Sequence, residues 1–182
     1  MIISISGKPG AGKSTVTKVL AEKLRMKHFY MGGIIRNMAK EKKQTLQEFY
    51  SNNADVDKLV DDYLTSLGKE EDNFLVESRT AFHFIPHSIK IYLDVDLEEG
   101  ARRIMEESQK ENERNEKKYT SLEEAKEWVE KRLQTEKERY KSLYNFDAHD
   151  KENYDYILDT TDMTVDEVQE KLINFIQQYN NQ

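Results

Sequence analysis

The chain has 182 residues, no cysteine and a formal net charge of −7 at pH 7, and its 37% of hydrophobic residues recur at regular spacing. The length suits one ordered domain, the absence of cysteine excludes disulfides and thiolate metal sites, and the negative charge argues against a general nucleic-acid binder. No apolar run reaches membrane-spanning length, and the first residues lack the basic flank of a signal peptide. We therefore expect a cytoplasmic protein, a monomer or a weak homodimer, that binds neither nucleic acid nor a membrane.

The amino-terminal half alternates short apolar runs with amphipathic ones. Residues 2–6 are apolar and β-branched and predict a buried strand, and the apolar stripe of residues 13–24 predicts a helix after it. A second strand is expected over residues 28–30, with Gly32 and Gly33 as its exit turn. Further helices are expected at 34–43 and 56–67, and further strands at 74–76 and 89–93.

The carboxyl-terminal half is dominated by charged helices. Residues 97–143 predict two helices, and the segment between them, residues 106–120, holds almost no large apolar side chain, so we expect it to be exposed and mobile. A fifth strand is expected over residues 156–158, and Thr164 with Glu167 has the spacing of a capping box for a last helix. This alternation predicts an α/β fold in which helices cover both faces of a parallel sheet.

A glycine-rich motif follows the first predicted strand. The run Gly7-Lys8-Pro9-Gly10-Ala11-Gly12-Lys13-Ser14 satisfies G-x-x-x-x-G-K-[ST], the P-loop pattern. Glycines let backbone N–H groups turn toward a phosphate chain, Lys13 would reach the β- and γ-phosphates, and the Ser14 hydroxyl would hold Mg²⁺. Because a strand and a helix flank the motif, we expect nucleotide binding rather than an ordinary glycine-rich turn. The expected ATP-binding residues are Gly7, Lys8, Pro9, Gly10, Ala11, Gly12, Lys13, Ser14 and Thr15.

Two arginines lie just past predicted strand ends. Arg36 comes one helical turn after Gly32 and Gly33, and Arg79 follows the third strand. In an open parallel sheet, ligands bind beyond the carboxyl ends of the strands, so both guanidinium groups could reach one crevice and clamp an acceptor phosphate. We favour this interpretation over surface arginines in local ion pairs. The sequence holds no Asn-Lys-x-Asp guanine-reading motif, which argues against a GTPase.

Several motifs follow one another in a characteristic order. After the P-loop come Gly32-x-x-x-Arg36, Glu77-Ser78-Arg79, Arg132-x6-Arg139-Tyr140 and Tyr154-Asp155-Tyr156-Ile157-Leu158-Asp159-Thr160. In this set the chain resembles the cytidylate kinases, in particular the short archaeal type, over nearly its whole length. The resemblance implies one P-loop kinase domain over residues 1–182, with a three-layer α/β/α fold and a five-stranded parallel sheet. It also implies an insert for the nucleoside monophosphate at about 34–70, a mobile lid at about 104–120, ATP and Mg²⁺ as co-substrates, and CMP or dCMP as acceptor.

The resemblance also implies roles for single residues. The residues that would bind the acceptor are Gly32, Gly33, Arg36, Asp57 and Arg79. The candidate catalytic residues are Lys13, Arg36, Arg79 and three lid arginines, Arg103, Arg114 and Arg132. Glu77 either orients a Mg²⁺-bound water or simply pairs with Arg79. Closing of the lid would expel water, which otherwise competes as an acceptor.

Departures from the family pattern leave the acceptor open. The Asp-Gly-Arg of bacterial relatives appears as Glu77-Ser78-Arg79, Thr80 replaces the aspartate that follows it, and Gly33 stands where relatives usually carry Asp or Ala. A kinase for AMP, UMP or a non-nucleotide metabolite therefore stays a rival. So do an ATP-binding regulatory module without chemistry and a helical partner-binding protein.

The remaining polar residues give weaker signals. Asp57 and Asp61 lie one helical turn apart and could form a carboxylate pair, but we favour a solvated helix face. The four histidines share no metal-ligand spacing, so we expect them to pack in the core or to lie at the surface.

Overall fold

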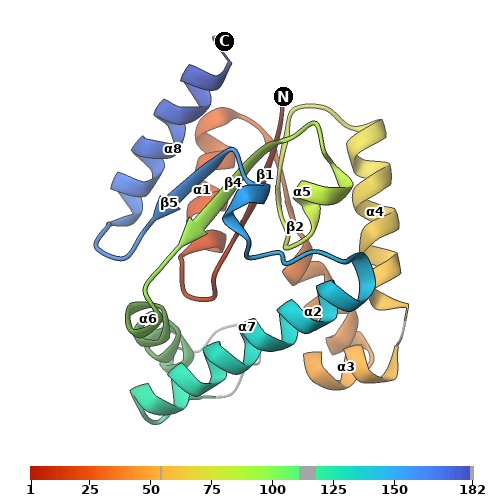
Figure 1. The fold of residues 1–182 in the computed structure, drawn as a ribbon, viewed down its shortest axis with the longest axis vertical. Helices are drawn as coiled ribbons and strands as arrows, with labels where there is room; N and C mark the ends of the chain where they lie inside the picture. The colour runs from red at the N-terminus through yellow and green to blue at the C-terminus, as the bar shows by residue number, and fades with distance from the viewer. Residues whose placement is uncertain (54, 111–117, 181–182) are drawn as a thin grey trace.

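The chain folds around a parallel sheet of five strands in the order β2-β3-β1-β4-β5 (Figure 1). The computed structural model describes residues 1–53, 55–110 and 118–180. The strands are β1 Ile2–Gly7, β2 Lys27–Tyr30, β3 Phe74–Glu77, β4 Ile89–Asp94 and β5 Tyr156–Asp159. Each of the five predicted strands is confirmed, and β1 lies at the centre, paired in parallel with β3 and β4.

Helices cover both faces of the sheet. They are α1 Lys13–Leu24, α2 Met31–Glu41, α3 Leu46–Asn52, α4 Val56–Glu70, α5 Ala81–Phe84, α6 Leu97–Gln109, α7 Leu122–Tyr144 and α8 Val165–Tyr179, with a short 3₁₀ helix, Lys151–Asn153. One face of the sheet packs against α1 and α8 and the other against α4 and α5, which confirms the predicted three-layer architecture. Within the described ranges, no helix combines the length and the apolar character needed to cross a bilayer.

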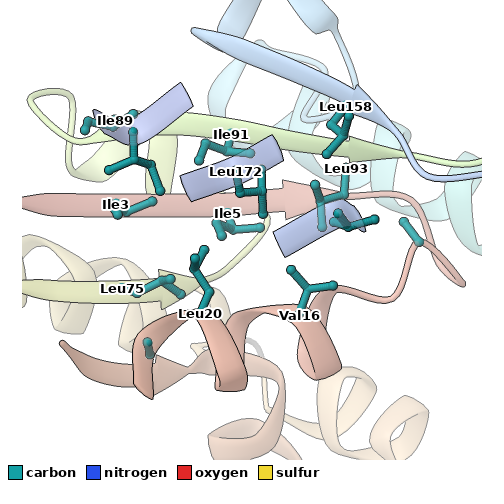
Figure 2. Packing of buried hydrophobic residues seen from close by; sticks show 14 of the residues in the cluster. Ile3, Ile5, Val16, Leu20, Leu75, Ile89, Ile91, Leu93, Leu158 and Leu172 are labelled. Carbon is teal, nitrogen blue, oxygen red and sulfur yellow. The ribbon is translucent and has the colours of Figure 1, made fainter. Parts of the chain in front are cut away.

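The core follows the two-residue period of the strands. Ile3 and Ile5 of β1 join a buried cluster with Leu20 of α1 and Leu172 of α8 (Figure 2). Ile2 of the same strand belongs to a second cluster on the other face. Successive side chains of a strand point to opposite faces, and each fully buried aliphatic side chain contributes roughly 1.5–3 kcal/mol. This burial fixes β1, and with it the start of the glycine-rich loop.

Side-chain caps fix where two helices begin. Thr164 and Glu167 form the predicted capping box of α8, in which the Glu167 N–H donates to Thr164 Oγ1 at 3.3 Å. The Asp96 side chain caps α6 by accepting from the N–H groups of Glu98 and Glu99. One such cap stabilises a helix by about 1 kcal/mol. The Asp96 cap starts α6 directly after the end of β4.

Gly32 and Gly33 do not form the expected exit turn. They lie in the first turn of α2, which begins at Met31, before its predicted start. A Cβ atom on Gly32 would come within 2.9 Å of the Tyr30 ring, and one on Gly33 within 2.6 Å. The two glycines therefore let the Tyr30 ring lie against the start of α2.

Tyr119 departs from the exposure that the sequence predicts for the charged segment of residues 106–120. α6 continues into it as far as Gln109, and Tyr119 is only 2% exposed. The Tyr119 ring packs against Trp128 of α7, with 5.6 Å between the ring centroids. Tyr119 thus belongs to the cluster of apolar side chains between α6 and α7. Arg114 lies outside the described residues.

The long helix α7 brings distant parts of the chain to the carboxyl end of the sheet. It runs beyond the strand ends, from α6 toward α4 (Figure 1). Ala125 and Val129 in its first half pack against α6, whereas Tyr140 in its second half packs with Phe82 and Tyr92. The helix therefore lies over the edge at which ligands of parallel sheets bind.

Candidate active site

The glycine-rich loop between β1 and α1 contains two left-handed glycines. Gly10 and Gly12 have φ values of 80° and 76°. A Cβ atom on Gly10 would lie 2.3 Å from the backbone oxygen of Gly100 in α6, whereas one on Gly12 would meet nothing within 4 Å. No side chain in the described parts of the chain caps α1 at Gly12. The first N–H groups of α1 therefore have no side-chain cap beside an open position at Gly12, and such helix starts bind phosphate.

The other residues of the loop differ in exposure. Pro9 and Ala11 are buried, and Thr15 is exposed in the first turn of α1. The Lys8 ammonium group pairs with Asp94 at 2.8 Å, and the Lys8 N–H donates to the Leu93 carbonyl at 3.0 Å. Lys8 thereby ties the loop to the end of β4.

Lys13 carries a buried ammonium group at the start of α1. Its Nζ donates to the Lys8 carbonyl at 2.5 Å. Burial and the charge of the Arg79 guanidinium hold the pKa of Lys13 well below its usual range. An anionic phosphate beside Lys13 would offset both effects. The loop thus holds a cation that lacks sufficient negative charge around it.

Ser14 and Glu77 place hard oxygen atoms beside the loop. Ser14 Oγ donates to Glu77 Oε1 at 3.1 Å, and Thr17 Oγ1 donates to Oε2 at 3.3 Å. Mg²⁺ prefers oxygen ligands and usually takes only one or two from the protein, with water and phosphate completing its shell. Within the described residues, no group of three or more metal-ligating side chains occurs. Ser14 and Glu77 therefore fit a Mg²⁺ ion that is bound mainly by nucleotide phosphates.

Arg79 pairs with Glu136 of α7 and not with Glu77. Arg79 Nε donates to Glu136 Oε2 at 2.8 Å, and Arg132 Nε donates to Oε1 at 3.0 Å. The side chains of Arg79 and Glu136 are 15% and 12% exposed. Burial alone would raise the pKa of Glu136, but Arg79 and Arg132 outweigh it and hold this pKa well below its ordinary value. The ionised carboxylate of Glu136 therefore holds the side chains of two arginines in place.

Arg36 lies on α2, close to the end of β2. Its Nη1 donates to Tyr30 Oη at 2.6 Å, and its guanidinium lies 5.9 Å from the centroid of the Tyr30 ring. Tyr30 is the register partner of Glu77 on the neighbouring strand. Arg36 and Arg79 therefore follow adjacent strands at one edge of the sheet.

Asp57 and Asp61 face α7, so the predicted solvated helix face is wrong. Arg139 Nη2 donates to Asp57 Oδ1, and Tyr144 Oη donates to Asp61 Oδ2, both at 2.5 Å. The Arg139 guanidinium also lies 4.0 Å from the centroid of the Tyr50 ring. Burial raises the pKa of Asp61 to about 6. These contacts join α4 to α7 beyond the strand ends.

Arg103 joins the glycine-rich loop to the end of β5. Its Nη2 donates to the carbonyl oxygens of Thr160 and Thr161, both at 2.8 Å, and its Nη1 approaches the Gly10 carbonyl at 3.5 Å. Its Nε donates to Glu99 at 2.6 Å. Backbone oxygens and one carboxylate thus hold this guanidinium.

Arg132 acts through its charge on Lys13 of the glycine-rich loop. Its guanidinium lies 5.1 Å from the centroid of the Trp128 ring, and its charge contributes to the lowered pKa of Lys13. The sequence analysis left Trp128 and Glu136 out of the site. Glu136, however, lies four residues after Arg132 and three before Arg139, so all three share one helix face. This spacing is the sequence pattern from which the place of Glu136 beside the two arginines could have been predicted.

Comparisons with known proteins show the family of the chain. A family model described as an AAA domain matches residues 3–152. The cytidylate kinase of Methanothrix thermoacetophila is 36% identical over 163 residues, which cover 88% of each chain. The cytidylate kinase of Methanocaldococcus jannaschii is 34% identical over 176 residues, which cover 92% of this chain and 93% of that protein.

A solved structure shares the fold. The shikimate kinase of Bacteroides thetaiotaomicron matches with a TM-score of 0.66 and 17% identity, over 97% of this chain and 98% of that one. Likeness at this identity shows the fold alone, whereas the archaeal proteins are similar in sequence over nearly the whole chain. The chain belongs to the cytidylate kinase family and is a phosphotransferase of the nucleoside monophosphate kinase type.

Proposed function

We propose that this kinase transfers the γ-phosphoryl group of ATP to CMP or dCMP, which yields ADP and CDP or dCDP. One observation carries the proposal: Glu136 holds Arg79 at 2.8 Å and Arg132 at 3.0 Å beyond the strand ends, and the charges of both arginines act on Lys13 of the loop. Two phosphate-bearing substrates would supply the negative charge that these cations require. The names of the archaeal relatives support a cytidylate acceptor.

On the donor side, residues 7–15 cradle the phosphates of ATP. The open space over Gly12 and the first N–H groups of α1 receive the phosphate chain. The Lys13 ammonium exchanges the Lys8 carbonyl for phosphate oxygens. Ser14 and, through water, Glu77 would hold Mg²⁺, which would supply positive charge to the phosphates.

On the acceptor side, Arg36 and Arg79 hold the monophosphate. Glu136 occupies Arg79 Nε, and within the described residues the two Nη atoms of Arg79 have no hydrogen-bond partner. Both Nη groups can therefore donate to a phosphate as a bidentate pair. The monophosphate is already ionised at neutral pH, so positioning suffices and the reaction needs no general base.

The insert of residues 34–70 and the lid of residues 104–120 complete the assignment. Arg132, held by Glu136 near Lys13, neutralises the transferring group, and we assign the same task to Arg114 in the lid. Arg103 donates to backbone carbonyls, so it holds the loop against the end of β5.

Asp57 and Arg139 offer a means of reading the base. The edge of cytosine presents an amino donor beside a ring-nitrogen acceptor, whereas uracil presents a carbonyl acceptor in place of the amino group and an N–H donor beside it. A carboxylate next to a guanidinium complements cytosine and repels uracil at the carboxylate. Asp57 and Arg139 form such a pair at 2.5 Å, with the Tyr50 ring against the guanidinium. This pair would take over the role of the aspartate that bacterial relatives carry at the position of Thr80.

An ADP-release assay over CMP, dCMP, UMP, AMP and shikimate tests the proposal. We expect the highest kcat/KM with CMP or dCMP. Arg36→Ala and Arg79→Ala should each lower kcat/KM for the acceptor roughly 10- to 100-fold with ATP affinity retained, because a charge-assisted hydrogen bond contributes about 1.5–3 kcal/mol. Asp57→Asn should reduce the preference for CMP over UMP roughly tenfold.

Arg102→Ala is the matched control. Arg102 lies on α6 with its side chain 46% exposed and pairs only with Glu99 and Glu106 among the described residues, so its loss should leave the acceptor kinetics unchanged. Strong turnover of AMP with none of CMP or dCMP would refute the cytidylate assignment. Binding of ATP without turnover of any acceptor would instead indicate a regulatory module.

A further inference from the structure

A buried chain of hydrogen bonds joins the sheet to Glu136. Tyr92 Oη lies 2.9 Å from His149 Nδ1, and His149 Nε2 lies 3.0 Å from Glu136 Oε2. Tyr92 is 0% exposed in β4, and the His149 side chain is 13% exposed. The chain therefore runs from a strand next to the central one, through a loop, to the helix that carries Arg132.

The protonation pattern of this chain follows from its ends. Arg79 and Arg132 overcome the effect of burial and keep the pKa of Glu136 well below its ordinary value, so this carboxylate is ionised and only accepts. His149 Nε2 must therefore carry a proton. Burial raises the pKa of Tyr92, so its hydroxyl remains protonated, and it can donate to His149 Nδ1 or accept from it. The direction of donation is therefore fixed at the other end, from His149 Nε2 to Glu136.

The backbone around His149 is itself held in place. The His149 N–H donates to Asp147 Oδ1 at 2.9 Å, and Asn153 Nδ2 donates to the Asp147 carbonyl at 2.9 Å. Tyr154 Oη donates to the carbonyl of Ala148 at 2.6 Å. A side chain whose backbone is fixed in this way presents its donor in one position.

We propose that His149 is a positioning residue for phosphoryl transfer, which fixes the Glu136 carboxylate and through it the guanidinium groups of Arg79 and Arg132. The inference rests on the proposed function. Glu136 accepts from Arg79 after β3, from Arg132 on α7 and from His149 after α7. Without the imidazole donor, the carboxylate can rotate and carry both arginines with it. A displacement of about 1 Å at reacting groups can lower a rate roughly 100-fold.

Three substitutions separate positioning from packing. His149→Gln keeps an N–H near the place of Nε2, within reach of Glu136, whereas His149→Asn places one near Nδ1, and His149→Ala removes both. We expect His149→Ala and His149→Asn to lower kcat/KM for the acceptor roughly 10- to 100-fold with the KM for ATP unchanged. His149→Gln should stay within about threefold of the wild type, because it keeps the contact with Glu136. His87→Ala, in an exposed turn, is the control without effect.

Two kinetic results would overturn the inference. One is an equal loss in all three variants that follows a common fall in Tm, and the other is an unchanged acceptor kcat/KM in His149→Ala. Nitrogen NMR of the imidazole ring reads the hydrogen-bond chain without activity, and a proton on Nδ1 with none on Nε2 would also refute it. If the wild type phosphorylates another acceptor in place of CMP and dCMP, the cytidylate assignment fails. The kcat/KM values of the His149 variants are then measured with that other acceptor, and the inference is still tested. The two failures are therefore distinguishable.

Discussion

At the scale of single residues, Asp61 shows how tertiary surroundings set the chemistry of a side chain. Burial raises its pKa from an ordinary value of 3.8 to about 6, although the hydrogen bond from Tyr144 opposes this shift. Between these two pKa values, the folded state binds more protons at Asp61 than the unfolded state does. The contribution of Asp61 to the free energy of unfolding therefore falls as the pH rises from about 4 to about 6, and it stays constant above.

Asp61→Asn should remove this loss of stability at neutral pH. The amide carries no charge to bury, and its oxygen can still accept from Tyr144. Relative to the wild type, we expect the variant to gain about 1 kcal/mol in free energy of unfolding between about pH 4 and pH 7, a figure that allows for solvent screening of a half-exposed group. Urea unfolding across this pH range measures the difference.

Lys58→Gln provides the comparison, since Lys58 is exposed on the same helix and its replacement removes no carboxyl group. Its difference from the wild type in free energy of unfolding should lack the rise between about pH 4 and pH 6 that we expect for Asp61→Asn. A gain for Asp61→Asn that is equally independent of pH would contradict the assignment of the raised pKa to Asp61.

The sequence could not predict the surroundings of these carboxylates. The spacing of Asp57 and Asp61 places both on one helix face, which was correct. Their partners, Arg139 and Tyr144, lie 82 and 83 residues further along the chain. A local pattern carries no information about such partners, so the more frequent solvated face was favoured. His149 was missed for the same reason, because its partners lie on β4 and α7.

At the scale of elements, two glycines of the glycine-rich loop have different roles, because Gly10 packs against α6 and Gly12 borders open space. Gly10→Ala places a Cβ atom 2.3 Å from the Gly100 carbonyl oxygen, so loop and helix must move apart. Gly12→Ala meets no atom within 4 Å and adds only the strain of a left-handed alanine, about 1–2 kcal/mol. We expect Tm to fall roughly 2–8 °C for Gly12→Ala, and further for Gly10→Ala, in which the clash adds to the same strain of a left-handed alanine.

For ATP affinity, we expect Gly12→Ala to have a larger effect than Gly10→Ala. Gly12→Ala fills the space that we assign to phosphate, so calorimetry should show ATP affinity reduced at least roughly tenfold in this well-folded variant. Scanning calorimetry of the Gly10→Ala and Gly12→Ala variants measures the loss of Tm. A larger loss of Tm in Gly12→Ala than in Gly10→Ala would show that the open space is closed in solution.

The elements themselves were largely predictable. The strands were found because short runs of apolar and aromatic residues stand out between polar segments, and Thr164 with Glu167 marked the start of α8. The short helices α3 and α5 were missed, although Thr45 and Glu48 form a capping box at the start of α3. Helix α2 was begun too late because glycine usually interrupts helices, and the Tyr30 ring that requires the glycines is a tertiary contact.

At the scale of the whole molecule, the distribution of charge matters more than its sum. The chain carries a net charge of −7, yet Lys13, Arg79 and Arg132 share one region at the carboxyl end of the sheet. The sequence predicted that the cations of the P-loop, strand ends and lid would converge. It could not identify Glu136 as the anion between two of them, because that role depends on how α7 lies across the sheet.

Glu136→Gln should make the fold depend on an added anion. The amide keeps the shape of the side chain but leaves buried cations without their counter-charge, and removal of one partner of a buried ion pair destabilises a protein by roughly 3–5 kcal/mol. Inorganic phosphate bound among Lys13, Arg79 and Arg132 would restore negative charge. We therefore expect a low Tm without phosphate and a larger phosphate-induced rise than in the wild type. Glu138→Gln, at an exposed position on the same helix, should behave as the wild type does. Equal rises in Glu136→Gln and the wild type would mean that phosphate does not replace this carboxylate.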